Sequence, residues 1–148
     1  MSASSGPPAH LDPSLTAAVR DGVARATAVT ALAGVALIHL LDLPGTFGEQ
    51  PYKGWLHLGL IGGCLLAAAA LIRDGDTRAW LAATLLPLGA ISGYVISRTV
   101  GLSGGADDIG NWTEPLGLAS LFVEGSLVAL AAAVLRSRGG ALIEAVAR

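Results

Sequence analysis

Long apolar stretches alternate with short polar ones along this chain. Four stretches carry almost no charged residues, and the charges gather in the short segments between them. A surface helix of a soluble protein needs a polar face along its whole length, and these stretches lack one. Each is close to the roughly 20 residues that a helix needs to cross about 30 Å of hydrocarbon. The pattern therefore predicts four transmembrane helices, at residues 26–43, 54–72, 79–97 and 115–135.

The remaining segments are expected to lie outside the hydrocarbon. They are a disordered or amphipathic N-terminal segment (1–25, of which 15–25 can extend the first helix), a turn-rich loop (44–53), a tight polar turn (73–78), a longer loop (98–114) and a short tail (136–148). Short connections favour antiparallel neighbours. The sequence thus predicts an all-α membrane protein, with an antiparallel four-helix transmembrane bundle over residues 26–135.

Basic residues that flank the spans predict the orientation of the bundle. Lysine and arginine are enriched on the cytoplasmic side of membrane proteins. With both termini in the cytoplasm, only Lys53 and Arg98 lie outside. The other seven lie inside: Arg20, Arg25, Arg73, Arg78, Arg136, Arg138 and Arg148. We therefore expect a multi-pass protein of the bacterial plasma membrane with both termini cytoplasmic.

Composition narrows the functional classes. Hydrophobic residues make up 53% of the chain and charged residues 14%, against about 25% charged in an average soluble domain. The net charge is −2 and no basic stripe is present, which argues against nucleic-acid binding. No nucleophile elbow, phosphate-binding loop or HExxH motif occurs, so an enzyme is disfavoured. The expected partner is the lipid bilayer, and a homo-oligomer or a larger membrane complex is left open.

Ionisable groups within the spans are the strongest functional signal, because such groups are costly in a membrane. His39 and Asp42 are three residues apart and share a helix face. Glu124 lies about ten residues inside the fourth span, near mid-membrane at 1.5 Å per residue. We therefore predict a polar site in the outer half of the bundle. Its candidate residues are His39, Asp42, His57, Tyr94, Arg98, Glu114 and Glu124.

Three functions are compatible with these residues. The first is a structural or accessory membrane subunit, in which polar groups only set helix register. The second is a metal- or haem-binding protein that uses His39 and His57, since histidine binds zinc and copper; no HxxxH or CxxC motif supports it, and the cofactor is unknown. The third is a small transporter or proton-transfer protein that uses Glu124.

Each candidate also has a purely structural explanation. Glu114, before Pro115, suits a helix start, where an anion is favoured. Asp42 can pair with Lys53 or Arg98, and Arg98 can instead pair with an acid of the 98–114 loop. Glu124 can be a neutral acid that is hydrogen-bonded to a serine, a tyrosine or a carbonyl oxygen.

Small and aromatic residues predict how the helices pack and where they meet the interface. Gly59 and Gly63 in the second span, and Gly89 and Gly93 in the third, have the spacing that allows two helices to approach closely. Tryptophan is enriched at membrane interfaces. The chain has three tryptophans at predicted span boundaries, namely Trp55, Trp80 and Trp112.

Two runs resemble an uncharacterised family of small four-transmembrane-helix integral membrane proteins of high-GC bacteria. They are HLLDLPGTFGEQPYKGWLHLGL (39–60) and GYVISRTVGLSGGADDIGNWTEPLGLASLFVEG (93–125). The shared features include a histidine near the end of the first span, a Glu-x-x-Tyr motif at 49–52 and a Glu-Pro-Leu-Gly start of the last span. The resemblance covers about residues 26–135. It implies a fold and a location, and it implies no activity, ligand or partner.

Overall fold

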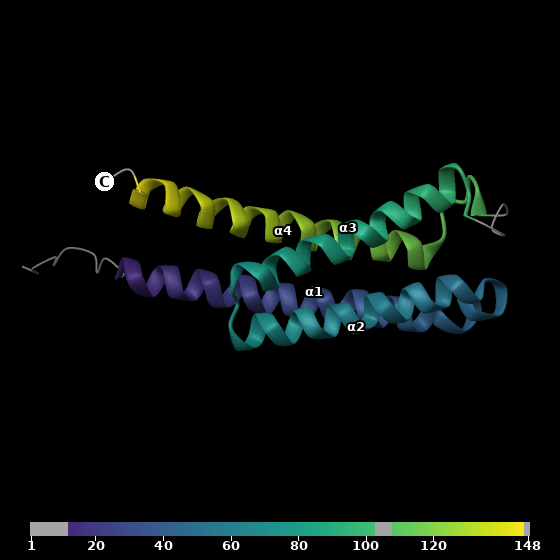
Figure 1. Cartoon of the computed structure of the whole chain (residues 1–148), viewed down its shortest axis with the longest axis horizontal. Helices are drawn as coiled ribbons and strands as arrows, with labels where there is room; N and C mark the ends of the chain where they lie inside the picture. The colour runs from purple at the N-terminus through teal and green to yellow at the C-terminus, as the bar shows by residue number, and fades with distance from the viewer. Residues whose placement is uncertain (1–11, 103–107, 147–148) are drawn as a thin grey trace, which may run out of the picture.

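The computed structural model describes residues 12–102 and 108–146. Four helices form an antiparallel bundle, and the described residues contain no strand (Figure 1). They are α1 (Pro13–Glu49), α2 (Pro51–Arg73), α3 (Thr77–Thr99) and α4 (Pro115–Val146). All four are long and apolar enough to cross a membrane, which supports a multi-pass membrane protein. The predicted all-α four-helix architecture is confirmed.

The connection between α1 and α2 differs from the prediction. Residues 44–53 were expected to form a loop, but α1 continues to Glu49 and only Gln50 separates it from α2. Pro44 lies inside α1; membrane helices tolerate proline because neighbouring polar groups satisfy the freed carbonyls. Pro51 then begins α2, at a position where the missing N–H is not needed. The expected loop is therefore replaced by the last turn of α1, the single residue Gln50 and the first turn of α2.

Both ends of the chain extend the bundle on the same side. α1 begins at Pro13, where the Asp12 side chain accepts a hydrogen bond from the Ser14 N–H. Residues 15–25 thus extend the first helix, as predicted. The segment after Arg136, expected to be a short tail, continues α4 to Val146. In Figure 1 these two extensions project past the α2–α3 turn, and we call this the arginine-rich end of the bundle.

The core is built mainly from small and aliphatic residues. α1 packs chiefly against α2 and α3 chiefly against α4, with further contacts of α1 with α4 and of α2 with α3. Large apolar side chains such as Leu66 and Phe122 lie largely exposed on the outside of the bundle, as expected where the surroundings are lipid. The buried core includes Leu32, Val35, Cys64, Ala67, Leu71, Trp80, Ala83, Leu127 and Ala131.

Close contacts at glycine occur at different places from those predicted. Of the four glycines singled out, only Gly63 lies directly against the facing helix, where an added Cβ would meet Leu86 at 2.8 Å. Three other glycines make closer approaches: Gly54 against Phe47, Gly75 against Arg25 and Gly117 against Tyr94. Trp80 was expected to be exposed at the membrane interface, but its side chain is fully buried within the bundle. The Arg138 guanidinium covers its ring at 5.8 Å.

Candidate functional site

The candidate residues form two neighbouring clusters at the end of the bundle opposite the arginine-rich end. The first, which we call the polar cluster, consists of His39, Asp42, His57, Ser120 and Glu124. The second, which we call the Arg98 network, consists of Lys53, Tyr94, Ser97, Arg98, Asp108 and Glu114. Sequence reasoning had placed Tyr94, Arg98 and Glu114 in one site with the histidines.

Glu124 is the deepest member of the polar cluster. It lies nine residues after the start of α4, about 14 Å along the helix axis, and only 1% of it is exposed. Ser120, one turn earlier on α4, donates a hydrogen bond of 2.8 Å to its Oε1. The same oxygen lies 3.8 Å from His39 Nε2 of α1. Glu124 therefore has one direct partner and one imidazole within reach.

His39 can connect Glu124 to the rest of the cluster. Its Nδ1 lies 3.0 Å from the Val35 carbonyl oxygen, and a carbonyl oxygen only accepts hydrogen bonds. The proton of a neutral His39 is thereby placed on Nδ1, and the lone pair of Nε2 faces Glu124. A distance of 3.8 Å is too long for a direct hydrogen bond and suits one bridging water or a small side-chain movement.

His57 extends the cluster towards the surface. Its ring packs edge-on against that of His39, with centroids 4.9 Å apart and an angle of 85° between the planes. Its Nδ1 lies 3.7 Å from Asp42 Oδ2. Within the described part of the chain, no hydrogen-bond partner is in range of this buried nitrogen. Asp42 in turn accepts a hydrogen bond from the Thr46 hydroxyl, so the predicted pairing of Asp42 with Lys53 or Arg98 does not form.

Exposure rises steadily along this series of side chains. The exposed fraction is 2% for the Glu124 side chain, 13% for His39, 22% for His57 and 41% for Asp42. Adjacent groups are 3.7 to 4.9 Å apart by the measures given above. The cluster is therefore a graded connection between a buried carboxyl group and the surface of the bundle.

The structure brings together His39 and His57, the two residues at which a metal or haem was predicted. Among the residues that the structure describes, no group of three or more His, Cys, Asp or Glu side chains is arranged to hold a metal ion. The two imidazole rings touch edge to face, which leaves no space for a porphyrin between them. A metal or haem at these histidines stays a prediction, and a porphyrin between the two rings would require α1 and α2 to separate.

The Arg98 network joins three parts of the fold. Arg98, at the end of α3, is 7% exposed. Its guanidinium binds Asp108 (Nη1 to Oδ1, 2.6 Å) and Glu114. Asp108 also accepts hydrogen bonds from Lys53 Nζ of α2 at 2.8 Å and from the Ser97 hydroxyl at 3.0 Å. The network holds the described part of the α3–α4 connection against α2 and α3. Arg98 thus pairs with an acid of this loop, as one structural explanation predicted.

Asp108 is ionised at neutral pH. Burial opposes its ionisation, but the hydrogen bonds from Lys53 and Ser97 and the charges of Lys53 and Arg98 outweigh burial. The pKa of Asp108 therefore lies below its ordinary value of 3.8. The network is in its ionised, paired form at neutral pH.

Tyr94 supports Arg98 and does not reach the histidines by any contact in the structure described here. The Arg98 guanidinium lies 4.9 Å from the centre of the Tyr94 ring, and the ring of Trp112 lies 6.0 Å from it on another side. Glu114 pairs with Arg98, so its role is more than that of a helix start.

Sequence reasoning did not single out Ser120 or Ser97. The spacing of Ser120, four residues before Glu124, was a usable signal, because side chains four apart lie on one helix face. The role of Ser97 depends on where the loop returns, which no local spacing reveals. No family model, no curated protein and no solved structure matches this chain in the comparisons with known proteins.

Proposed function

We propose that this chain is an integral membrane protein that binds a proton reversibly at Glu124. The proton enters and leaves through His39, His57 and Asp42. The observation that carries the proposal is the graded burial of these four side chains, from the nearly inaccessible Glu124 to the half-exposed Asp42. Such a series is what a proton needs to move between a buried acid and water.

A proton is the ligand that best fits the chemistry of the cluster. An unpaired carboxylate near mid-membrane is costly, and a neutral carboxylic acid is much less so. His39 offers Glu124 an imidazole nitrogen that can accept a proton and return it. Because His39 and His57 are in ring contact, little space is left for a larger solute between them.

The connection is one-sided. Beyond Glu124, towards the arginine-rich end, the bundle core consists of side chains that cannot relay a proton, including Leu32, Ala67, Leu71, Leu127 and Ala131. Two titratable groups of other helices lie near Glu124: His39 of α1 and the buried Cys64 of α2. The proton therefore returns to the side from which it came, which fits a pH-responsive membrane subunit better than a conducting pathway.

The setting of this function follows from the sequence. The chain is proposed to lie in the bacterial plasma membrane with both termini cytoplasmic, so that the polar cluster opens to the outer side. Seven of the nine basic residues then lie inside, as the positive-inside rule requires. Membership of the high-GC bacterial family that the chain resembles belongs to the same proposal.

The first test is infrared difference spectroscopy of the protein in nanodiscs as the pH is varied. The wild type is expected to show a pH-dependent carboxylic-acid C=O band that is absent from Glu124→Gln. Glu114→Gln removes an acid of the Arg98 network and serves as the matched control, which should retain the band. A band that persists unchanged in Glu124→Gln would overturn the proposal.

The role of His39 is tested in the same experiment. His39→Gln removes the titratable ring while keeping a polar side chain, so the band should change at a different pH from that of the wild type. His10 is not a suitable comparison, because it lies outside the described residues; Tyr52→Phe, at an exposed position, is used instead and should leave the band unchanged. Identical titrations of wild type and His39→Gln would show that Glu124 exchanges its proton by another route.

A structural or accessory role is the second candidate, and the Arg98 network favours it. The ion pairs of Arg98 hold Asp108 and Glu114 of the α3–α4 connection against the end of α3, and Ile109 and Trp112, which lie between them, are exposed. Such a fixed surface suits contact with another membrane protein. Mild-detergent purification tests this idea: a stoichiometric partner that is retained by wild type and lost in Trp112→Ser supports it.

A further inference from the structure

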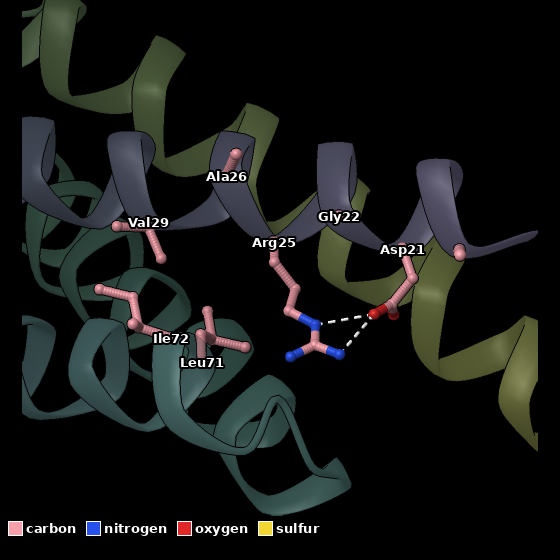
Figure 2. Close-up of a pocket in the computed structure, with 8 residues that line it drawn as sticks. Asp21, Gly22, Arg25, Ala26, Val29, Leu71 and Ile72 are labelled. Atoms are coloured by element: carbon pink, nitrogen blue, oxygen red, sulfur yellow. Dashed lines mark hydrogen bonds and ion pairs between the residues drawn. The ribbon is translucent and has the colours of Figure 1, made fainter. Parts of the chain in front are cut away.

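A groove of about 380 Å³ lies at the arginine-rich end of the bundle, and none of the residues that line it belongs to the polar cluster. α1 begins at Pro13 and continues past the end of α2 at Arg73. Beyond that point α2 no longer covers α1, and the groove lies there. Figure 2 shows the groove between these two helices. The residues that line it include Asp21, Gly22, Arg25, Val29, Leu71 and Ile72.

The groove is polar at one end and apolar at the other. In Figure 2 the side chains of Val29, Leu71 and Ile72 gather between α1 and α2, while Arg25 and Asp21 lie further along α1, beyond the end of α2. Arg25 and Val29 are one helical turn apart, about 6 Å along the axis. This order of apolar and charged groups along a membrane helix matches the order of acyl chain and headgroup in a lipid.

At the charged end of the groove, Asp21 is shared between Arg25, which lines the groove, and Arg138 of α4, which lies behind it. Asp21 Oδ2 is 2.6 Å from Arg25 Nη2, and Asp21 Oδ1 is 3.2 Å from Arg138 Nη2. One carboxylate between two guanidinium groups leaves a net charge of +1. Arg138 also donates a hydrogen bond to the Gly75 carbonyl oxygen, which ties it to the turn between α2 and α3. The Arg25 side chain is 35% exposed and thus accessible to a ligand.

From these observations we infer that the groove binds one anionic phospholipid. Its phosphate diester lies beside Arg25, and one acyl chain lies against Val29 and Ile72. The single negative charge of a phosphatidylglycerol headgroup matches the excess of +1, whereas phosphatidylcholine carries its own cation and gains little there. The site is independent of the proton bound by Glu124.

Native mass spectrometry of the detergent-purified protein tests the inference, with phosphatidylglycerol and phosphatidylcholine added at equal concentration. The wild type is expected to retain phosphatidylglycerol at least fivefold better. Arg25→Gln should lower this retention about fivefold, the effect of one basic residue at a membrane surface. Arg78→Gln is the matched control, because Arg78 is an exposed arginine at the same end that does not line the groove; it should retain the lipid like the wild type.

A second variant tests the shape of the groove independently of its charge. An added Cβ at Gly22 meets nothing within 4 Å, so Gly22→Leu fills the groove without removing a charge or straining the helix. It should lose phosphatidylglycerol while keeping the thermal stability of the wild type. Equal retention of the two lipids by the wild type, or unchanged retention in both Arg25→Gln and Gly22→Leu, would overturn the inference. Displacement of the lipid by millimolar inorganic phosphate would show a simple anion site and also overturn it.

Discussion

Gly117 is a position where the absence of one side chain allows two helices to meet. It lies in the first turn of α4, and a Cβ placed there would come within 2.5 Å of the Tyr94 ring of α3. The Tyr94 ring also contacts the Arg98 guanidinium and the Trp112 ring, which limits its freedom to move aside. Gly117 is therefore required for the contact between α3 and the start of α4.

We expect Gly117→Ala to lower the free energy of unfolding by about 1–3 kcal/mol, the usual effect of overpacking a filled interior. The measurement is reversible unfolding in detergent micelles. Gly125→Ala is the matched control on the same helix, because an added Cβ there meets nothing within 4 Å. That substitution should be neutral or stabilise the helix by up to about 1 kcal/mol. Equal stability of the two variants would show that Tyr94 can yield.

The connection between α3 and α4 shows how one element is held by charge. Asp108 accepts hydrogen bonds from Lys53 and Ser97 and pairs with Arg98. Its pKa is lowered on folding, so folding favours the ionised form. This contribution to stability is fully present above the unfolded-state pKa near 3.8 and is lost as the pH falls through the lower, folded-state value.

Asp108→Asn should therefore be less stable than the wild type at pH 7, by about 1–3 kcal/mol for lost charge-assisted hydrogen bonds. The difference should shrink as the pH falls below about 4, because the wild-type carboxylate is then protonated as well. The free energy of unfolding, measured from pH 3 to pH 7, checks this. Asp74→Asn is the control: Asp74 pairs only with the exposed Arg73 in the described structure, and such surface pairs contribute little. A pH-independent difference for Asp108→Asn would contradict the assignment.

The whole bundle is asymmetric along its long axis. Both helical extensions and most arginines are at one end, and the polar cluster opens towards the other. The single cysteine of the chain, Cys64, is fully buried. Reporter cysteines placed at the two ends can therefore be labelled with little background, which makes the predicted orientation testable.

Gly48→Cys places a thiol at the end of α1 near the polar cluster, at an exposed position where an added Cβ meets nothing within 4 Å. Asp74→Cys places one at the exposed turn after α2. If both termini are cytoplasmic, a membrane-impermeant maleimide added to intact cells should label Gly48→Cys at once and Asp74→Cys only after permeabilisation. The reverse pattern would invert the topology and place the lipid groove in the outer leaflet. The parent protein, with Cys64 alone, controls for background labelling.

The number of helices, their approximate membrane-spanning parts and the presence of deep polar groups were predictable from the sequence. These features depend on local composition: the length of an apolar stretch and the depth of Glu124 within it can be counted along the chain. The loop predicted at 44–53 was wrong because it too was inferred from local composition. Pro44 and two glycines signal a turn in water, whereas a membrane helix can continue through them.

The tertiary structure decided which polar groups meet. The rotation of each helix about its axis depends on packing between helices, and it places His39 between Glu124 and His57. The same packing directs Lys53 to Asp108 and buries Trp80 under Arg138. The sequence by itself thus determined that this is a four-helix membrane bundle with costly polar groups towards one end. Only the packed helices determined that those groups form one cluster of graded exposure and a separate network around Arg98.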